Sequence, residues 1–402
     1  MDVNNGRWRK AETAPQRMGF LFNHDQIHQI AHSLPVANAL AARLPNARIS
    51  LAVTNTRIEH EVKRLLGSNF PANLEVQRLG IHTAGSRLLT GALGKLVPAA
   101  KLLLYRDNLA YFRALDALIV TERTSLILKQ HFGLAGLKMI LIDHGAGDRA
   151  IGFGASTAQF DHVLASGAKI RDRLIADAGV TPDKIKIVGY PKFDAARADR
   201  EKLSFQCNGN PTIIYNPHLS PHLSSWFRHG REILDWFIAN PKYNLIFAPH
   251  VMLFQRRVVF TVDKFRVAFP GKLDKKYLEA SNIHVDMGSV ASTDMTYTNA
   301  ADIYLGDVSS QIYEFLRVRR PAIFIDSQAT DFKNDPNYAH WRAGEVIRTV
   351  NQLGLALDRA DALHRAMYMA AQKTLFDYTF ELTSEPSSHR AAHAIAEITG
   401  HG

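Results

Sequence analysis

The sequence has little of what secreted and membrane-spanning proteins depend on. It contains one cysteine, Cys207, so no disulfide can form within the chain, and this favours a reducing compartment. No run of about 18 apolar residues is present that could cross a bilayer. Residues 1–17 form a basic tail without the apolar core of a secretory signal. We therefore expect a cytoplasmic protein.

Motifs of several nucleotide-binding and hydrolytic classes are also missing. We find no Walker A loop, no GxGxxG after a strand and no GxSxG nucleophile elbow. No nucleic-acid-binding motif is present, so nucleic acid is not an expected partner. His24, His28 and His32 have helical spacing, but the first and third lie more than two turns apart and no Cys or Glu set is nearby. The sequence therefore predicts no metal site and no cofactor.

Positive charge is in excess. The chain has 48 Lys and Arg against 38 Asp and Glu, a net charge of +10. This favours anionic partners, namely phosphorylated substrates and an anionic membrane surface. A hydrophobic content of 46% and a charged content of 21% are typical of a folded globular protein. At 402 residues, two domains are the default expectation.

The segment 86–115 is a candidate for membrane contact. It is dense in Leu and Ala, with basic side chains at Arg87, Lys95, Lys101, Arg106 and Arg113. A basic amphipathic helix can lie on an anionic bilayer. The same pattern suits a core helix whose Lys and Arg stems run along apolar surface. Both interpretations stay open, and the first would place the protein peripherally at the inner face of the cell membrane.

Apolar strands alternate with amphipathic helices along most of the chain. The predicted strands of the first series lie at 18–22, 49–55, 114–120, 137–143, 162–166 and 184–190. Those of the second series lie at 212–217, 244–249, 282–287, 302–306 and 322–326. A polar stretch around 195–211 separates the two series. Strand–helix alternation indicates mostly parallel sheets with right-handed crossovers.

The fold class follows from this alternation. It predicts an α/β protein with two doubly wound, Rossmann-like domains, at 18–195 and 211–375, facing a cleft. The stretch 376–402 predicts a C-terminal helix that packs back on the N-terminal domain. In such sheets ligands bind beyond the carboxyl ends of the strands, so the residues that follow the strands are the candidates for function.

Polar residues recur at these strand ends. The strand-end residues include His144, Gly145 and Arg149 after the fourth strand, Lys169 after the fifth, Gly189 at the end of the sixth with Pro191 after it, His218 and His250 after the next two, and Asp307, Ser309 and Ser310 after 302–306. Glycine lets backbone N–H groups approach a phosphate closely. Imidazole donates to phosphate or acts as a general acid or base near neutral pH. The recurrence favours an anion site.

The stretch DVSSQIYEFL, from Asp307 to Leu316, turns a strand into a helix directly after two hydroxyls. Ser309 or Ser310 can cap the helix. Alternatively, the serine pair and the free N–H groups bind a phosphate, although capping alone is the more common case. Glu314, further along the helix, can bind ribose hydroxyls or be an ordinary surface carboxylate.

Five short motifs follow one another along the second half of the chain. They are HG at 144–145, GYPKFD at 189–194, IIYNPH at 213–218, FAPH at 247–250 and NAADIYLGDVSSQIYEF at 299–315. In this order they resemble the CDP-glycerol glycerophosphotransferase family, the teichoic-acid polymerase type with a GT-B fold. The chain departs from the family pattern at two places. Family members usually have a threonine and a basic residue after the IIYxP strand, where this chain has His218, and Val251 rather than proline follows His250.

The resemblance implies a set of roles. A polyol phosphate moves from a CDP-activated donor to a hydroxyl of a glycan or polyprenyl-linked acceptor. His144 and His250 would flank the transferred phosphate as catalytic residues, and Ser309 and Ser310 would bind the donor diphosphate. The other expected contacts are Gly145 and His218 on the donor phosphates, Gly189, Pro191 and Glu314 on the nucleotide or ribose, and His24, His28 and Arg149 on the acceptor side.

Three hypotheses follow. The leading one is a metal-independent GT-B polyol-phosphate transferase with His144 as the base. The second is a GT-B glycosyltransferase that uses the same residues for a nucleotide sugar. The third is a non-catalytic nucleotide-binding protein.

Overall fold

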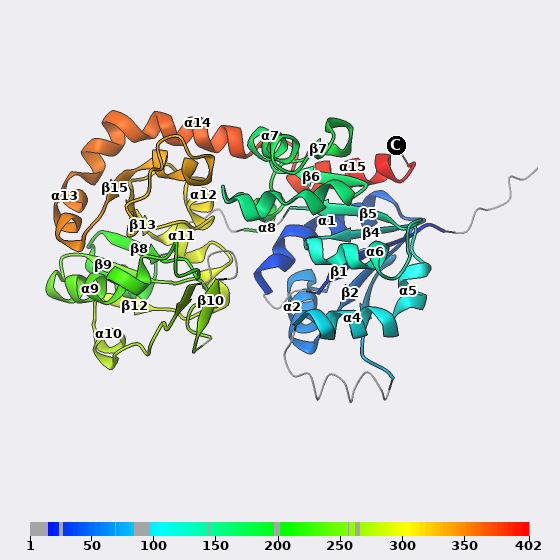
Figure 1. Ribbon diagram of the computed structural model, residues 1–402, viewed down its shortest axis with the longest axis horizontal. Coiled ribbons are helices and arrows are strands. Elements are labelled where there is room, and N and C mark those ends of the chain that lie inside the picture. The colour runs from blue at the N-terminus through cyan, green and yellow to red at the C-terminus, as the bar shows by residue number, and fades with distance from the viewer. Residues whose placement is uncertain are drawn as a thin grey trace, which may run out of the picture. The chain divides into compact units, whose positions relative to one another are not determined.

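The structure is a computed structural model of the chain (Figure 1). It describes residues 15–23, 27–68, 70–83, 97–143, 145–196, 202–255, 257–261 and 266–401. The chain divides into two compact units: unit 1 comprises Met1–Leu141 and Ala392–Gly402, and unit 2 comprises Ile142–Ala391. The polar stretch at 195–211 lies inside unit 2. The domain bounds that the sequence suggested stay a prediction.

The first sheet has seven strands in the order β3-β2-β1-β4-β5-β6-β7, and its described pairs are parallel. The strands are β1 (Arg17–Phe22), β2 (Arg48–Val53), β3 (Leu74–Arg78), β4 (Ala117–Val120), β5 (Lys138–Ile142), β6 (His162–Ala165) and β7 (Ile185–Ile187). The helices that connect them include α1 (Ile30–Arg43), α2 (Thr56–Leu66), α4 (Val97–Asp107), α5 (Leu109–Arg113), α6 (Ile127–Gln130), α7 (Ala168–Ala176) and α8 (Lys192–Ala195).

The second sheet lies in unit 2 and is also parallel, in the order β12-β9-β8-β13-β14-β15 (Figure 1). Its strands are β8 (Thr212–Asn216), β9 (Asn244–Phe247), β12 (Ile283–Val285), β13 (Ile303–Gly306), β14 (Ala322–Ile325) and β15 (Glu345–Ile347). The helices of this part are α9 (Trp226–Ala239), α10 (Lys275–Glu279), α11 (Thr296–Ala300), α12 (Gln311–Phe315), α13 (Leu353–Leu363) and α14 (Met369–Thr379). The last helix, α15 (Ser387–Ile398), begins in unit 2 and ends in unit 1. A separate antiparallel hairpin pairs β10 (Val259–Thr261) with β11 (Arg266–Ala268).

The predicted α/β fold class is confirmed, and all eleven predicted strands are present. Four further strands were missed, for a physical reason. β3 has a single buried residue, so it lacks the apolar run that marks an interior strand, and β10, β11 and β15 are only three residues long.

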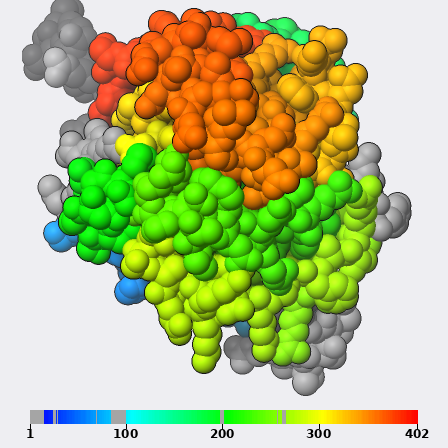
Figure 2. All heavy atoms as spheres, turned by 90° about the vertical axis from the view of Figure 1, so that its left-hand side faces the viewer, coloured from blue at the N-terminus to red at the C-terminus, as the bar shows by residue number. Residues whose placement is uncertain are grey.

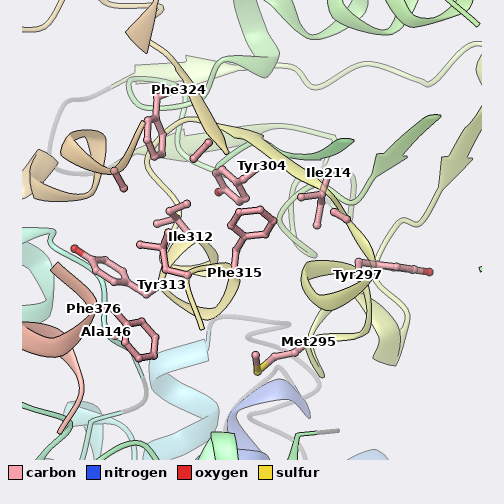
Figure 3. Close-up of a cluster of buried hydrophobic side chains, with 14 of the residues drawn as sticks. Ala146, Ile214, Met295, Tyr297, Tyr304, Ile312, Tyr313, Phe315, Phe324 and Phe376 are labelled. Atoms are coloured by element: carbon pink, nitrogen blue, oxygen red, sulfur yellow. The ribbon is translucent and has the colours of Figure 1, made fainter. Parts of the chain in front are cut away.

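The core of unit 2 explains why the sequences of its strands are continuous apolar runs. Side chains alternate between two faces along each strand, and both faces are buried. In β13, Tyr304 belongs to one cluster and Leu305 to the other. Figure 3 shows the first cluster, in which Tyr304 and Phe315 lie with ring centroids 5.5 Å apart.

The other face of this sheet is covered by two helices that follow different strands. α9 contributes Ile233 and Phe237 to the second cluster, and α13 contributes Leu353 and Leu357. Figure 2 shows this side of unit 2, with the orange segment that contains α13 above the green segment that contains α9.

The segment proposed for membrane contact is described only from residue 97 onward. In that part Tyr105 and Phe112 are buried, and Lys101 forms an ion pair with Glu122. These contacts suit the core-helix interpretation for the described part, while membrane contact stays a prediction. Among the described residues, no helix combines the length and apolar character needed to span a bilayer.

A close approach at Gly167 provides a test of the fold. A methyl group added there would lie 2.5 Å from the carbonyl oxygen of Thr379, in the segment where Glu381 N donates to Ser166 O. We expect Gly167→Ala to lower the free energy of unfolding by about 1–3 kcal/mol, as measured by urea unfolding. Gly152→Ala is the control, because nothing lies within 4 Å of its added methyl. Equal stability of the two variants would contradict this packing.

Candidate functional site

Three of the predicted strand-end positions meet at one edge of the second sheet. β8 and β9 are adjacent, and β13 lies on the other side of β8, so their carboxyl ends are neighbours. His218 follows β8 and His250 follows β9, and their ring centroids are 5.8 Å apart. Ser309 and Ser310 follow β13. The loop after β5 reaches the same place, because a Cβ added at Gly147 would lie 3.3 Å from Ser310 Cβ.

Asp307 holds the turn between β13 and α12. Its fully buried carboxylate accepts hydrogen bonds from the backbone N–H groups of His218, Val308 and Ser225, and from Ser225 Oγ, at 2.6–2.9 Å. Burial raises the pKa of Asp307 to about 6, against the opposing effect of these donors. The side chain is therefore a carboxylate at neutral pH, and it orients the backbone N–H groups around it.

His218 and His250 have the same local geometry. In each, Nδ1 accepts from the backbone N–H two residues further on: Ser220 N at 2.9 Å and Met252 N at 3.2 Å. Burial and the nearby Arg149 lower the pKa of His250 to about 4 and hold the pKa of His218 well below its usual range. Both imidazoles are therefore neutral at pH 7, and each carries its proton on Nε2.

The contact between His218 and Arg149 brings two donors together. Nη1 of Arg149 lies 3.3 Å from Nε2 of His218. A guanidinium can only donate, and a neutral imidazole has one acceptor nitrogen, which His218 already uses for Ser220 N. One ring nitrogen therefore faces a donor whichever tautomer is present. An acceptor oxygen placed between Arg149 and His218 would satisfy both groups.

Of the two serines, Ser309 makes a bond that caps α12 and Ser310 makes none. Ser309 Oγ donates to Asn216 Oδ1 at 2.6 Å and accepts from Gln311 N at 3.3 Å. Ser310 is the N-cap residue of α12 but has helical backbone angles and makes no side-chain cap bond. Its side chain is exposed. Ser310 therefore presents a hydroxyl at the site edge, whereas Ser309 is already engaged by the protein.

A buried ionic cluster lies behind this edge. The carboxylate of Asp148 accepts from Lys169 Nζ at 2.7 Å, from Tyr313 Oη at 2.7 Å, and from His340 N and Nδ1 at 2.9 and 2.8 Å. Burial acts to raise the pKa of Asp148, but Lys169 and His340 together hold it well below its usual range. His340 Nε2 in turn donates to the carbonyl oxygen of Asp307 at 3.1 Å.

Glu314 is neither a surface carboxylate nor an open ribose ligand. It is buried and pairs with Lys192 at 2.6 Å, with Tyr190 Oη at 3.3 Å. Gly189, with φ of +85°, and the buried Pro191 lead into α8 beside this pair. Each of the three has packing contacts that explain it, so their proposed contacts with the nucleotide stay predictions.

Several predicted residues lie outside the described part of the chain. His24 and His144 are among them, and of His28 only the backbone, in a short 3₁₀ turn (Ile27–Gln29), is described. Gly145 is described, and no atom lies within 4 Å of a Cβ added to it. In the part of the chain that the structure describes, no three His, Cys, Asp or Glu side chains gather as metal ligands do. Metal independence stays a prediction.

Sequence reasoning missed His340 and Lys169 as parts of the site. His340 lies in a 3₁₀ segment (Pro336–Ala343) that follows no predicted strand, and it is 192 residues from its partner Asp148. No local signal marks it. Lys169 follows β6 and was visible as a strand-end residue, but nothing in the sequence pairs it with Asp148.

The comparisons with known proteins concern structure alone. No protein-family model matches the chain, and no curated protein matches it. The wall teichoic acid polymerase TagF, in a variant soaked with CDPG, has a TM-score of 0.60 at 14% identity over 96% of this chain and 88% of its own. The kitacinnamycin glycotransferase has a TM-score of 0.55 at 13% identity, over 96% of this chain and 99% of its own.

A third neighbour is a candidate UDP-N-acetylglucosamine 2-epimerase from Listeria monocytogenes, with a TM-score of 0.57 at 14% identity over 96% of this chain and 97% of its own. At such identities the likeness establishes the fold, which is the GT-B arrangement of two parallel α/β sheets. The predicted fold class is confirmed. A teichoic-acid polymerase, the type of protein that the motifs resemble, is among the structural neighbours.

Removing the charge of Asp148 tests the ionic cluster. Asp148→Asn leaves Lys169 and His340 buried without their anion, so we expect a loss of about 3–5 kcal/mol of unfolding free energy at pH 7. Because the pKa of Asp148 is depressed, its contribution is complete above the unfolded-state pKa near 4 and is lost as the pH falls through the folded-state value. In urea unfolding, the difference between wild type and variant should therefore begin to shrink as the pH falls below about 4 and should disappear only as the pH passes the lower folded-state value.

The matched control for this measurement is Asp377→Asn. Asp377 pairs with Lys373 on the exposed surface of α14, so its removal should change stability by less than about 1 kcal/mol. If Asp148→Asn lowers the free energy of unfolding no more than Asp377→Asn does, the ionic cluster does not contribute the stability expected of it.

Proposed function

We propose that the chain is a GT-B transferase that moves a polyol phosphate, such as glycerol phosphate, from a CDP-linked donor to a hydroxyl of a cell-surface glycan or its lipid-linked precursor. The observation that carries this proposal is the pair of facing donors, Arg149 and His218, beside the Nε2–H of His250. A phosphate oxygen could accept hydrogen bonds from these donors together. The motif order and the likeness to TagF support the choice of a CDP-linked donor.

The proposed chemistry follows from these residues. The acceptor hydroxyl attacks the β-phosphorus of the donor, with His144 as the base that takes its proton. A new O–P bond forms, the diphosphate bridge breaks, and CMP leaves. Arg149, His218 and His250 would stabilise the charge that builds on the phosphates. Ser310 would add its exposed hydroxyl, and Ser309 would do so by exchanging its bond to Asn216.

Two neutral imidazoles suit a site that must release an anionic product. They donate hydrogen bonds without adding positive charge, so the nucleotide is held by Arg149 and by dipoles rather than by several ionic bonds. Asp307 does not oppose the anion strongly, because four donors already surround its carboxylate. We propose acceptor-side roles for His24, His28 and Arg149. Because Arg149 would also contact the donor phosphate, it would lie between donor and acceptor.

The main alternative is a GT-B glycosyltransferase that uses a nucleotide sugar. The kitacinnamycin glycotransferase shares the fold across nearly the whole chain, and the same donors would bind a sugar diphosphate. A non-catalytic nucleotide-binding protein is the third possibility. The polyol-phosphate transferase and the glycosyltransferase differ in the bond of the donor that they break. Turnover of a donor distinguishes both enzymes from a nucleotide-binding protein.

The released nucleotide tests the proposed reaction. We expect CDP-glycerol or a related donor to yield CMP and a product that contains phosphorus, because the diphosphate bridge is the bond that breaks. Chromatography of the nucleotide and mass spectrometry of the acceptor measure both. His144→Ala should abolish this release while leaving donor binding. Release of a nucleoside diphosphate with a phosphorus-free product would favour the glycosyltransferase, and binding without turnover of any donor would favour the binding protein.

Loss of one of the facing donors tests the phosphate site. We expect Arg149→Gln to weaken CDP binding by roughly tenfold or more, since a hydrogen bond to a charged group contributes about 1.5–3 kcal/mol. Calorimetry measures the affinity. Arg359→Gln is the control, because it removes the same charge from α13, where Arg359 pairs with Glu345 of β15. Unchanged affinity in Arg149→Gln would place the phosphates elsewhere.

A further inference from the structure

The hydroxyl of Tyr304 is a buried polar group that has no hydrogen-bond partner among the described residues. Tyr304 lies in β13 and is fully buried, and its ring packs against Phe315 and Phe324 in the first cluster (Figure 3). Buried hydroxyls in folded proteins normally have a partner, because an unpaired one costs the free energy of removing it from water. An unpaired hydroxyl next to a candidate site therefore suggests a role in that site.

The Tyr304 hydroxyl lies towards the carboxyl end of β13, where the serine pair follows. Side chains two residues apart share one face of a strand, and a Cβ added at Gly306 would lie 2.6 Å from Tyr304 Oη. The ring thus leans over Gly306 towards the turn. Burial and the Asp307 carboxylate raise the pKa of Tyr304 well above its usual range, whereas the hydroxyl of Ser309 acts to lower it. Both observations place Tyr304 Oη close to Ser309, without a hydrogen bond between them.

Ser309 has the capacity for one more hydrogen bond. A serine hydroxyl has one donor and two acceptor sites. Ser309 Oγ donates to Asn216 Oδ1 at 2.6 Å and accepts from Gln311 N at 3.3 Å, so one acceptor site is unused. An ionised phosphate oxygen can only accept, so it needs the donor site that Asn216 occupies. Ser309 must therefore turn away from Asn216 to bind a phosphate.

We propose that Tyr304 is a positioning residue, whose hydroxyl donates a hydrogen bond to Ser309 Oγ when Ser309 turns from Asn216 to a phosphate of the donor. This inference deepens the proposed function and rests on it. Tyr304 is buried away from the ligand and acts through Ser309. In the bound state Tyr304 donates to Ser309 and Ser309 donates to the phosphate. Each bond strengthens the next, because hydrogen bonds in a chain polarise one another.

The number of paired buried groups is the same before and after this exchange. In the free protein Asn216 Oδ1 has a donor, while Tyr304 Oη has no acceptor in the described part of the chain. In the bound state Tyr304 gains an acceptor and Asn216 Oδ1 loses its donor. The new bond from Ser309 to the phosphate is charge-assisted, so it is stronger than the bond that it replaces. The unpaired hydroxyl of Tyr304 thus lowers the cost of turning Ser309 towards the ligand.

The variant Tyr304→Phe tests this role in the full chain, with CDP as the probe. Without ligand the change removes a hydroxyl that has no described partner, so the melting temperature should equal or exceed that of the wild type. With CDP it removes the bond to Ser309, so the affinity measured by calorimetry should fall by about three- to tenfold.

The matched control is Tyr277→Phe. The hydroxyl of this buried tyrosine in α10 already donates to Asp235 at 2.9 Å. Its removal should therefore lower the melting temperature and leave the affinity for CDP unchanged, which is the reverse of the result expected for Tyr304→Phe.

A double-mutant cycle shows whether Tyr304 acts through Ser309. Ser309→Ala alone should weaken CDP binding. In the Ser309→Ala background the further change Tyr304→Phe should alter the affinity by less than about twofold, because its partner is gone. An equal loss in both backgrounds would assign the effect of Tyr304 to packing and would overturn the proposal.

Other results also contradict this role. Unchanged CDP affinity in Tyr304→Phe excludes the bond to Ser309, and a melting temperature lowered as in Tyr277→Phe shows that the hydroxyl is already paired in the free protein. Arg149→Gln separates this failure from failure of the proposed function. If Arg149→Gln weakens CDP binding and Tyr304→Phe does not, the phosphate site stands and only the role of Tyr304 is wrong. If the wild type binds no CDP, both proposals are wrong.

Discussion

The carboxylate of Asp148 is the buried charge around which the candidate site is arranged. An ionised carboxylate without water is stable only if nearly all its acceptor positions are used. Lys169 from α7, Tyr313 from α12 and His340 from the 3₁₀ segment Pro336–Ala343 supply the donors. The ammonium of Lys169 also lies 3.6 Å from the centroid of the Tyr313 ring. Segments far apart in the sequence are thus held at fixed positions by one charge, and none can move without leaving a buried group unpaired.

His340 carries this constraint to the edge of the second sheet. Its Nδ1 faces the Asp148 carboxylate, and its Nε2 faces the backbone carbonyl of Asp307, which can only accept. His340 thus joins the buried carboxylate of Asp148 to the main chain just after β13. Trp341 Nε1 donates to the same carbonyl at 2.9 Å. Asp307 is thereby fixed through its main chain, and its carboxylate fixes His218 through the backbone N–H of that residue. Three consecutive hydrogen bonds connect Asp148 to the backbone of a residue proposed to bind phosphate.

The sequence allowed the sheet edge to be predicted, but not the contacts behind it. Parallel strands share an edge, so apolar runs followed by His218, His250 and Ser309 were enough to place these residues together. Glu314 shows the limit: whether it faces water or is buried depends on Lys192, which is 122 residues away. The same holds for His340, whose partner is in a distant loop. The ends of strands can be predicted from the local periodicity of apolar residues. Buried ion pairs depend instead on which distant loops come into contact, and no local sequence pattern encodes those contacts.

The departure of this chain from the family pattern at position 218 has a physical consequence at the site. A threonine with a basic neighbour would supply a hydroxyl and a full charge, whereas His218 supplies one neutral N–H donor whose direction is set by the bond from Ser220 N to Nδ1. Because His250 uses the same turn geometry, the two imidazoles form a matched pair beside a single guanidinium. Such a site binds an anion through oriented dipoles, which need no reorganisation when charge shifts between oxygens. That property suits a phosphate whose charge moves onto a leaving group, and it is set by main-chain bonds that Asp307 and the Asp148 cluster hold in place.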